Sequence, residues 1–139
     1  MPESIHLDLV TPERRLIETE VSEVTAEAFE GEVTILPGHA NYVAILQTGE
    51  LSYLEDGARK HLAVSGGFAE VTLDDGIRIL AEAAEFPDEI DLDRAKSAFT
   101  RAERRITDFA PGAEEIDILR AQSAFKRALN RIKVAEKKS

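Results

Sequence analysis

The 139-residue sequence has no cysteine and no long apolar run. Without cysteine the chain forms no disulfide, no thiolate metal site and no cysteine nucleophile. A membrane-spanning helix needs roughly 18 or more apolar residues in succession, and none is present. The start, Met1-Pro2-Glu3-Ser4, lacks the basic residues and apolar stretch of a signal peptide. We therefore expect any membrane association to come indirectly, through partner proteins.

Motifs of catalytic sites are also missing. The three histidines, His6, His39 and His61, show none of the spacings of zinc sites. Ser65-Gly66-Gly67 is not the Gly-x-Ser-x-Gly elbow of hydrolases, and the sequence contains no Gly-x-x-x-x-Gly-Lys phosphate loop. The sequence therefore predicts a protein that is not an enzyme, with no catalytic residue, no catalytic cofactor and no bound metal.

Charge is distributed unevenly along the chain, whose net charge is −10. Residues 1–90 carry 19 acidic and 5 basic side chains, a balance of −14. Residues 91–139 carry 8 acidic and 12 basic side chains, a balance of +4. This asymmetry indicates two segments with different surfaces, of which the second could attract an anion. The acidic total argues against nucleic acid as a partner.

Residues 1–84 show the pattern of short strands between frequent turns. Ile5, Leu7 and Leu9 alternate with polar residues, which gives one apolar face at a period of two. Turn signals such as Pro37-Gly38 and Asp56-Gly57 recur between such runs. No helical pattern intervenes, so the segment is predicted to be an all-β sandwich or barrel.

The alternation changes phase at two places in this segment. The apolar series continues from Val21 to Val24 and from Phe68 to Val71, a step of three residues in each case. A polar residue therefore occupies the position two residues after Val21 and after Phe68, where strict alternation requires an apolar one. A β-bulge inserts one extra residue into a strand and would restore the phase. We therefore expect a bulge at each place.

Residues 85–139 are predicted to form an antiparallel two-helix hairpin. Apolar residues recur alternately three and four apart in two series, and Ala110-Pro111-Gly112-Ala113 separates them. Asp91 or Asp93 can cap the first helix. The seam is rich in alanine and each CH₂ that it buries contributes only about 0.8 kcal/mol, so the hairpin could open. The two series are Leu92, Ala95, Phe99, Ala102, Ile106, Phe109 and Ile118, Ala121, Phe125, Ala128, Ile132, Ala135.

Four arginines of this segment form two pairs, Arg94 with Arg101 and Arg127 with Arg131. Spacings of seven and four residues place the members of each pair on one helix face, and antiparallel packing could bring the two pairs together. Guanidinium groups bind phosphate oxygens, and carboxylates such as Asp91 and Glu85 accept hydrogen bonds from the amino group of a base. A solvated basic face explains the spacing equally well and is the more common arrangement.

Three motifs together resemble a known family. Gly31-Glu32-Val33-Thr34-Ile35-Leu36-Pro37-Gly38-His39, Ser65-Gly66-Gly67-Phe68 and the opening His6-Leu7-Asp8-Leu9-Val10-Thr11-Pro12-Glu13 are similar to segments of the epsilon subunits of bacterial F-type ATP synthases. The resemblance covers the whole chain, including its length and its order of a β segment followed by a helical hairpin.

The resemblance implies a rotor subunit of the proton-translocating complex. A sandwich of about ten short strands, residues 1–84, would dock on the gamma subunit and the c-ring. The loops with Glu30-Gly31-Glu32 and Pro37-Gly38-His39 are similar to those that lie on the ring. The hairpin, residues 85–139, would extend towards the alpha and beta subunits and inhibit ATP hydrolysis. The protein would lie peripherally at the cytoplasmic face of the bacterial plasma membrane.

Some members of this family carry an ATP site with the pattern Ile/Leu-Asp-x-x-Arg-Ala. Here the pattern is Ile90-Asp91-Leu92-Asp93-Arg94-Ala95, and the accompanying residues correspond to Arg101, Arg127, Arg131 and Glu85. These are the residues that charge and spacing select, so the resemblance favours ATP as a regulatory ligand. Ile116-Asp117-Ile118-Leu119-Arg120-Ala121 also fits the short pattern, and we assign that copy to chance. A free-standing nucleotide-binding module is the alternative.

Overall fold

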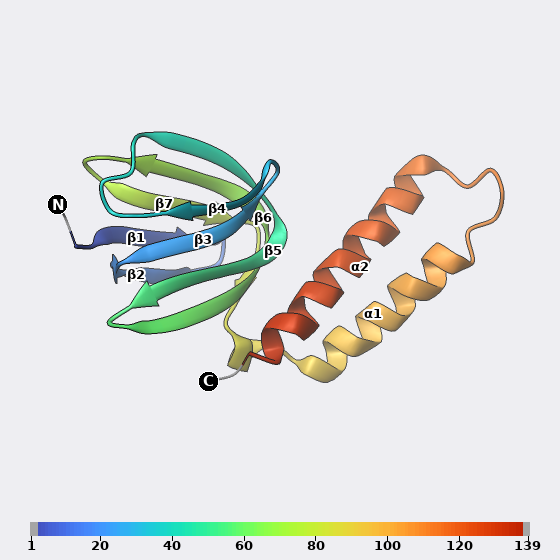
Figure 1. Ribbon diagram of the computed structural model, residues 1–139. Coiled ribbons are helices and arrows are strands. Elements are labelled where there is room, and N and C mark those ends of the chain that lie inside the picture. The colour runs from blue at the N-terminus through green and yellow to red at the C-terminus, as the bar shows by residue number, and fades with distance from the viewer. Residues whose placement is uncertain (1–2, 138–139) are drawn as a thin grey trace. The chain divides into compact units, whose positions relative to one another are not determined.

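The computed structural model describes residues 3–137. The chain divides into two compact units, residues 1–85 and residues 86–139. The first, called the β unit below, contains the strands of the described chain. The second, called the hairpin unit, contains its two α-helices (Figure 1).

The β unit is a curled sheet of eight strands within the described residues. The order across the sheet is β2-β1-β7-β6-β5-β3-β4, and β8 pairs with β6. All pairings are antiparallel except that of β1 with β7. The strands are β1 (Ile5–Val10), β2 (Arg15–Val21), β3 (Glu23–Ala28), β4 (Gly31–Ile35), β5 (Tyr42–Glu55), β6 (Ala58–Thr72), β7 (Gly76–Ala81) and β8 (Ala84–Glu85).

Two long strands run through both halves of the sandwich, and Figure 1 shows how they bend with the sheet. β5 has 14 residues and β6 has 15, and they pair in a single register from Tyr42 opposite Val71 to Glu55 opposite Ala58. The predicted fold class, a β-sandwich followed by a helical hairpin, is confirmed. Eight strands are present where about ten short ones were expected, because β5 and β6 each continue where two short strands would stand.

The core of the β unit comes from the inward positions of the alternating strands. Strand β1 follows the predicted pattern, with Leu7 and Leu9 completely buried. Each large side chain removed from water contributes about 1.5–3 kcal/mol, so a core of this size can stabilise the unit by itself. The most deeply buried large residues are Leu7, Leu9, Leu51, Leu62, Ile77, Ile79, Val21, Val24 and Val71.

Both bulge predictions are wrong. Residues 67–71 of β6 pair without interruption with β7, and Phe68 points outward while Val71 points inward. The apolar residue at position 68 therefore lies on the outer face, and its strand has no extra residue. At the other place Val21 ends β2 and Val24 lies in β3, so the bend at Ser22 resets the phase.

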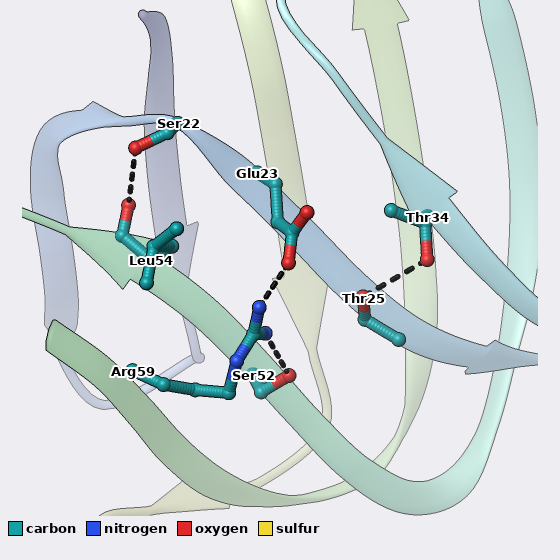
Figure 2. Close-up of polar contacts among 7 residues, drawn as sticks. All are labelled: Ser22, Glu23, Thr25, Thr34, Ser52, Leu54 and Arg59. Atoms are coloured by element: carbon teal, nitrogen blue, oxygen red, sulfur yellow. Dashed lines mark hydrogen bonds and ion pairs between the residues drawn. The ribbon is translucent and has the colours of Figure 1, made fainter. Parts of the chain in front are cut away.

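Polar side chains connect strands on the outer face (Figure 2). The Arg59 guanidinium forms an ion pair with Glu23 and donates a hydrogen bond to Ser52 Oγ at 3.0 Å. The hydroxyls of Thr25 and Thr34 are 3.0 Å apart, across the β3–β4 pair. These contacts connect β6 with β5 and β3, and β3 with the edge strand β4.

A second polar group connects β2 with the β5–β6 hairpin. Thr19 Oγ1 donates to Glu55 Oε2 at 2.6 Å, and Lys60 Nζ lies 2.7 Å from Glu55 Oε1. The hydrogen bond from Lys60, followed by that from Thr19, lowers the pKa of the Glu55 carboxyl below its ordinary value. The same partner raises the pKa of Lys60. Edge strand β2 is therefore attached to β5 through an ionised carboxylate.

The hairpin unit consists of a short 3-10 helix, η1 (Pro87–Glu89), and the helices α1 (Leu92–Thr107) and α2 (Glu115–Ala135). Asp91 is the residue that caps α1, because its Oδ1 accepts a hydrogen bond from the Arg94 amide at 3.1 Å. A turn at residues 108–114 reverses the chain, so the two helices run antiparallel (Figure 1).

The predicted alanine-rich seam is confirmed. Five alanines at seam positions are at most 4% exposed, and the rings of Phe99 and Phe125 meet with centroids 4.8 Å apart and planes inclined by 35°. Phe109, expected to continue the seam, lies beyond the end of α1 at Thr107 and is half-buried. The buried seam alanines are Ala95, Ala102, Ala121, Ala128 and Ala135.

We predict that residues 1–85 fold without the hairpin unit, because the core described above is internal to the β unit. The fragment should unfold cooperatively on heating and give a strand-type circular dichroism spectrum. The parent chain serves as the control. An insoluble or non-cooperatively melting fragment would contradict an independent β unit.

A second prediction concerns the stability of the β unit as a function of pH. Since Glu55 has a lowered pKa in the folded state, its contribution to stability is present above its unfolded pKa and is lost as pH falls through the folded value. Glu55→Gln should therefore destabilise the protein at neutral pH, and the difference from the parent should shrink in acid. Urea unfolding at about pH 7 and about pH 3 measures this.

The matched control is Glu30→Gln, which removes an exposed carboxylate. It should show little pH-dependent difference from the parent. A Glu55→Gln difference that is constant with pH would show that the carboxylate charge has no role in the contact.

Candidate functional site

The predicted ATP pattern lies where η1 leads into α1. Ile90 follows η1 and is 5% exposed, Asp91 caps α1, and Ala95 is completely buried in the seam. Arg94 lies in the first turn of α1 with its side chain exposed. Ile90, Asp91 and Ala95 therefore have structural roles in the start of the helix, which fix the position of Arg94.

The helical geometry places the arginine pairs on one face of the hairpin unit. Arg94, Arg101 and Arg127 each immediately precede a buried seam alanine, and Arg131 lies one turn beyond Arg127. In an antiparallel helix pair, equivalent positions of the two helices lie on the same side. The arginine pairs predicted to come together therefore share this face.

The Phe99–Phe125 contact fixes the height of each arginine along the hairpin. An α-helix rises about 1.5 Å per residue. Measured along the hairpin axis from the Phe99–Phe125 contact, the Cα atoms of the four arginines therefore lie within about 12 Å of one another. Arg94, Arg101 and Arg127 are exposed, and Arg131 is half-buried. Ala98 and Ala124 occupy the positions between the seam and the arginines, so no large side chain starts between the two pairs.

Glu85, the remaining residue expected at the ATP site, belongs to the β unit. It ends β8, where it pairs with Ala63 of β6. The hairpin unit by itself therefore supplies the four arginines, Ile90, Asp91 and Ala95.

The loops expected on the c-ring lie at the two ends of β4. Glu30-Gly31-Glu32 forms the turn into the strand, and Glu30 and Glu32 are exposed. Pro37-Gly38-His39 follows the other end, where His39 Nδ1 lies 2.7 Å from the Ala40 carbonyl and the ring meets the edge of Tyr42. Strand β4 separates the two loops, so they form two surfaces.

The structure also shows an apolar strip that sequence reasoning missed. Ile45, Phe68 and Leu80 are direct cross-strand neighbours on β5, β6 and β7, and they are 59%, 38% and 49% exposed. Val43, two residues before Ile45 on the same face, is 57% exposed. The change of phase at Phe68 was the available signal, because it marks an apolar side chain on the outer face.

In residues 3–137, no group of three or more histidine or acidic side chains could hold a metal ion. No helix in this part of the chain is long and apolar enough to cross a membrane.

Comparison with known proteins agrees with this architecture. The family model for the ATP synthase delta/epsilon chain β-sandwich domain matches residues 4–87, and that for the long α-helix domain matches residues 88–136. The ATP synthase epsilon chain of Solibacter usitatus is 43% identical over 112 residues, which are 81% of this chain and 83% of the relative. That of Geobacter metallireducens is 46% identical over 111 residues, 80% of each chain.

Two solved structures share the fold. A chain of the Euglena gracilis mitochondrial ATP synthase, in a structure of OSCP, F1 and the c-ring, has a TM-score of 0.81 and 25% identity. The match covers 98% of this chain and 83% of that one. A chain from the central stalk and c-ring of the Tetrahymena thermophila enzyme has a TM-score of 0.59 and 18% identity, over 95% and 93% of the two chains, and supports the fold alone.

These matches confirm the resemblance found in the sequence. The chain belongs to the delta/epsilon chain family of ATP synthase, among the bacterial epsilon chains, which are structural and regulatory subunits and not catalytic ones.

Proposed function

We propose that this protein is a rotor subunit of a bacterial proton-translocating ATP synthase. Its β unit docks on the gamma subunit and the c-ring, and its hairpin unit binds ATP and regulates hydrolysis. The neighbouring structures are ATP synthase complexes that contain F1 or central-stalk subunits and a c-ring. The complex would hold the protein peripherally at the cytoplasmic face of the plasma membrane.

The apolar strip is the single observation that carries the docking role. A row of exposed Ile45, Phe68 and Leu80 on three adjacent strands is unfavourable in a protein that stays alone in water. A partner that covers the row removes this surface from water, and each large side chain then contributes about 1.5–3 kcal/mol. A free-standing nucleotide-binding module needs no such surface, so the strip favours a subunit of a complex.

We assign the strip to the gamma subunit and the two loops beside β4 to the c-ring. The strip lies on three adjacent strands, which form a continuous apolar surface suited to a protein partner. The loops carry exposed Glu30 and Glu32 on one side and His39 on the other. Polar groups of this kind suit the polar ends of a membrane-embedded ring better than its apolar sides.

The arginine face carries the ATP-sensing role. Arg94, Arg101, Arg127 and Arg131 bring like charges together when the hairpin is closed, which is unfavourable without an anion. The phosphate groups of ATP, with a charge near −4, offset this repulsion through charge-assisted hydrogen bonds. ATP therefore binds the closed hairpin better than the open one, and only this difference in affinity can shift the population.

Regulation follows from this population shift. At high ATP the hairpin stays closed and the complex is free to turn over. At low ATP it opens, and its helices extend towards the alpha and beta subunits and inhibit hydrolysis. The seam supports this role, because five of its buried residues are alanines, and each methyl-sized contact contributes only about 0.8 kcal/mol.

We predict that Phe68→Glu weakens binding to the gamma subunit by about 2 kcal/mol or more, because a charge is then buried at the centre of the strip. Folding should be preserved, since Phe68 lies on the outer face. Calorimetric titration of isolated gamma with the full chain measures this. Ile116→Glu is the matched control, since it replaces an exposed apolar residue on α2. Equal affinity for the parent and Phe68→Glu would place the gamma contact elsewhere.

Arg94→Ala and Arg127→Ala should each lower the affinity for ATP by about 1.5–3 kcal/mol, the contribution of a hydrogen bond between charged groups. Inhibition of hydrolysis should also respond less to ATP, while assembly of the complex is unchanged. Calorimetry with the isolated chain and hydrolysis assays on the complex provide the two measurements.

Lys133→Ala removes an exposed charge of α2 and is the matched control for this experiment. It should bind ATP as the parent does. If both arginine variants also bind like the parent, the arginine face is not the ATP site. If the parent fails to bind at about millimolar ATP, the hairpin has no sensing role.

A further inference from the structure

The C-terminal end of α2 contains a buried side chain that the seam does not explain. An α-helix turns by about 100° per residue, so Val134 lies roughly 150° away from the centre of the seam face of α2. Ile116 lies about five turns earlier on the same outer face and is 53% exposed. Val134, in contrast, is 0% exposed. An element other than α1 therefore covers the outer face of α2 at this end.

The hairpin unit supplies such an element in η1. Because η1 directly precedes α1 and α2 runs antiparallel to α1, η1 lies at the C-terminal end of α2, and the two elements are in contact (Figure 1). A 3-10 turn brings side chains three residues apart to the same side, which groups Pro87 with Ile90. Both are buried, as is Val134. Each element therefore brings buried apolar side chains to this end of the hairpin.

Hydrogen bonds attach η1 to the start of α1. The Phe86 amide donates to Glu89 Oε1 at 2.9 Å. The Ile90 amide donates to the Pro87 carbonyl at 3.3 Å, and the next residue, Asp91, caps α1. The 3-10 helix and α1 thus form one continuous element. When α2 separates from α1, it must also leave η1.

The burial of Val134 exceeds that of the large seam residues. It is the largest completely buried side chain among the described residues of the hairpin unit. Phe99, Phe125 and Ile132 in the seam are only half-buried. Because apolar burial stabilises roughly in proportion to the area removed from water, Val134 contributes more to the closed hairpin than any single alanine of the seam.

We propose that η1 and the last turns of α2 form a latch that holds the hairpin closed, in which Val134 packs against Pro87 and Ile90. The inference rests on the proposed opening of the hairpin, because the latch must break before the helices separate. It does not rest on ATP, since an aliphatic side chain acts by packing alone. Val134 lies one turn beyond Arg131, so the latch holds the end of α2 that carries two arginines of the proposed ATP site. The latch and ATP would thus stabilise the same closed state through different contacts.

The test measures how often the hairpin of the isolated full chain opens. The sequence has no cysteine, so Ala102→Cys places a single thiol in the seam, where Ala102 is 3% exposed. A buried thiol reacts with an aromatic disulfide reagent only when the hairpin opens, and the labelling rate is then proportional to the open population. Ala102 lies in the half of α1 far from η1, so the rate reports opening of the whole hairpin and not fraying at the latch.

Without ATP, Val134→Ala in this background should raise the labelling rate about tenfold, because two buried methyl groups are lost. Alanine has the highest helix propensity, so a weaker helix cannot account for the increase. Val134→Thr keeps the shape of the side chain but buries a hydroxyl, and it should also raise the rate. Ile116→Ala is the matched control, since it truncates an exposed side chain on the same face and should leave the rate unchanged.

Ile90→Ala tests whether η1 is the other half of the latch. If Ile90 and Val134 pack against each other, the second substitution finds the contact already weakened. The double variant should then raise the labelling rate by less than the product of the two single increases.

Two results would overturn the latch. One is an equal labelling rate in Val134→Ala and Ile116→Ala. The other is a double-variant increase equal to the product of the single increases, which would show that the two side chains act separately.

Addition of ATP separates this inference from the proposed function. A rate that ATP lowers in the parent, and that Val134→Ala leaves unchanged, contradicts the latch and supports ATP sensing. A rate that rises in Val134→Ala, and that ATP does not change in the parent, supports the latch and contradicts ATP sensing.

Discussion

The long pairing of β5 with β6 is the constraint on which the β unit depends. Its register sets the inward faces of both halves of the sandwich, and it also places Ile45 directly opposite Phe68 on the outer face. A slip of one residue would move the inward side chains of the slipped strand to the outer face. Gly67 allows β7 to approach, because a Cβ at this position would lie 2.4 Å from the Leu80 carbonyl oxygen. The core and the apolar strip therefore arise from the same register.

The hairpin unit, in contrast, is held together mainly by small side chains. Its alanines allow two helices to approach closely, and the Phe99–Phe125 pair supplies the one large aromatic contact of the seam. Small side chains make a close but weakly held interface. Such an interface suits a segment whose open and closed states differ little in free energy. A ligand of modest affinity can then shift the population from one state to the other.

The sequence predicted those features that depend on local spacing. Period-two alternation and the 3.5-residue spacing of the two apolar series are local, and they led to the β-sandwich, the hairpin and its seam. The helix cap was narrowed only to Asp91 or Asp93, and the structure identifies Asp91. The register between strands far apart in the chain is not local. The row formed by Ile45, Phe68 and Leu80 was therefore invisible, and the outward position of Phe68 was mistaken for a bulge.

The sequence predicted only those features of the candidate site that follow from the geometry of a single helix. The arginine pairs follow from spacings of seven and four residues, whereas their relative height needed the Phe99–Phe125 contact. Phe109 continued the apolar series in spacing, but α1 ends at Thr107, and a residue beyond the helix end no longer follows its period. ATP as the ligand is a prediction from the family resemblance, because residue spacing alone cannot identify a ligand.

The parallel pairing of β1 with β7 has a consequence for synthesis on the ribosome. β1 is among the first segments to emerge, yet its neighbour in the sheet, Ile77 to Leu80, is made some 70 residues later. Until then β1 has only β2 beside it, and an isolated two-stranded pair is marginal in water. Closure of the sheet must therefore await β7, and the segment that follows is the hairpin unit. Translation thus completes the β unit before it produces the hairpin unit.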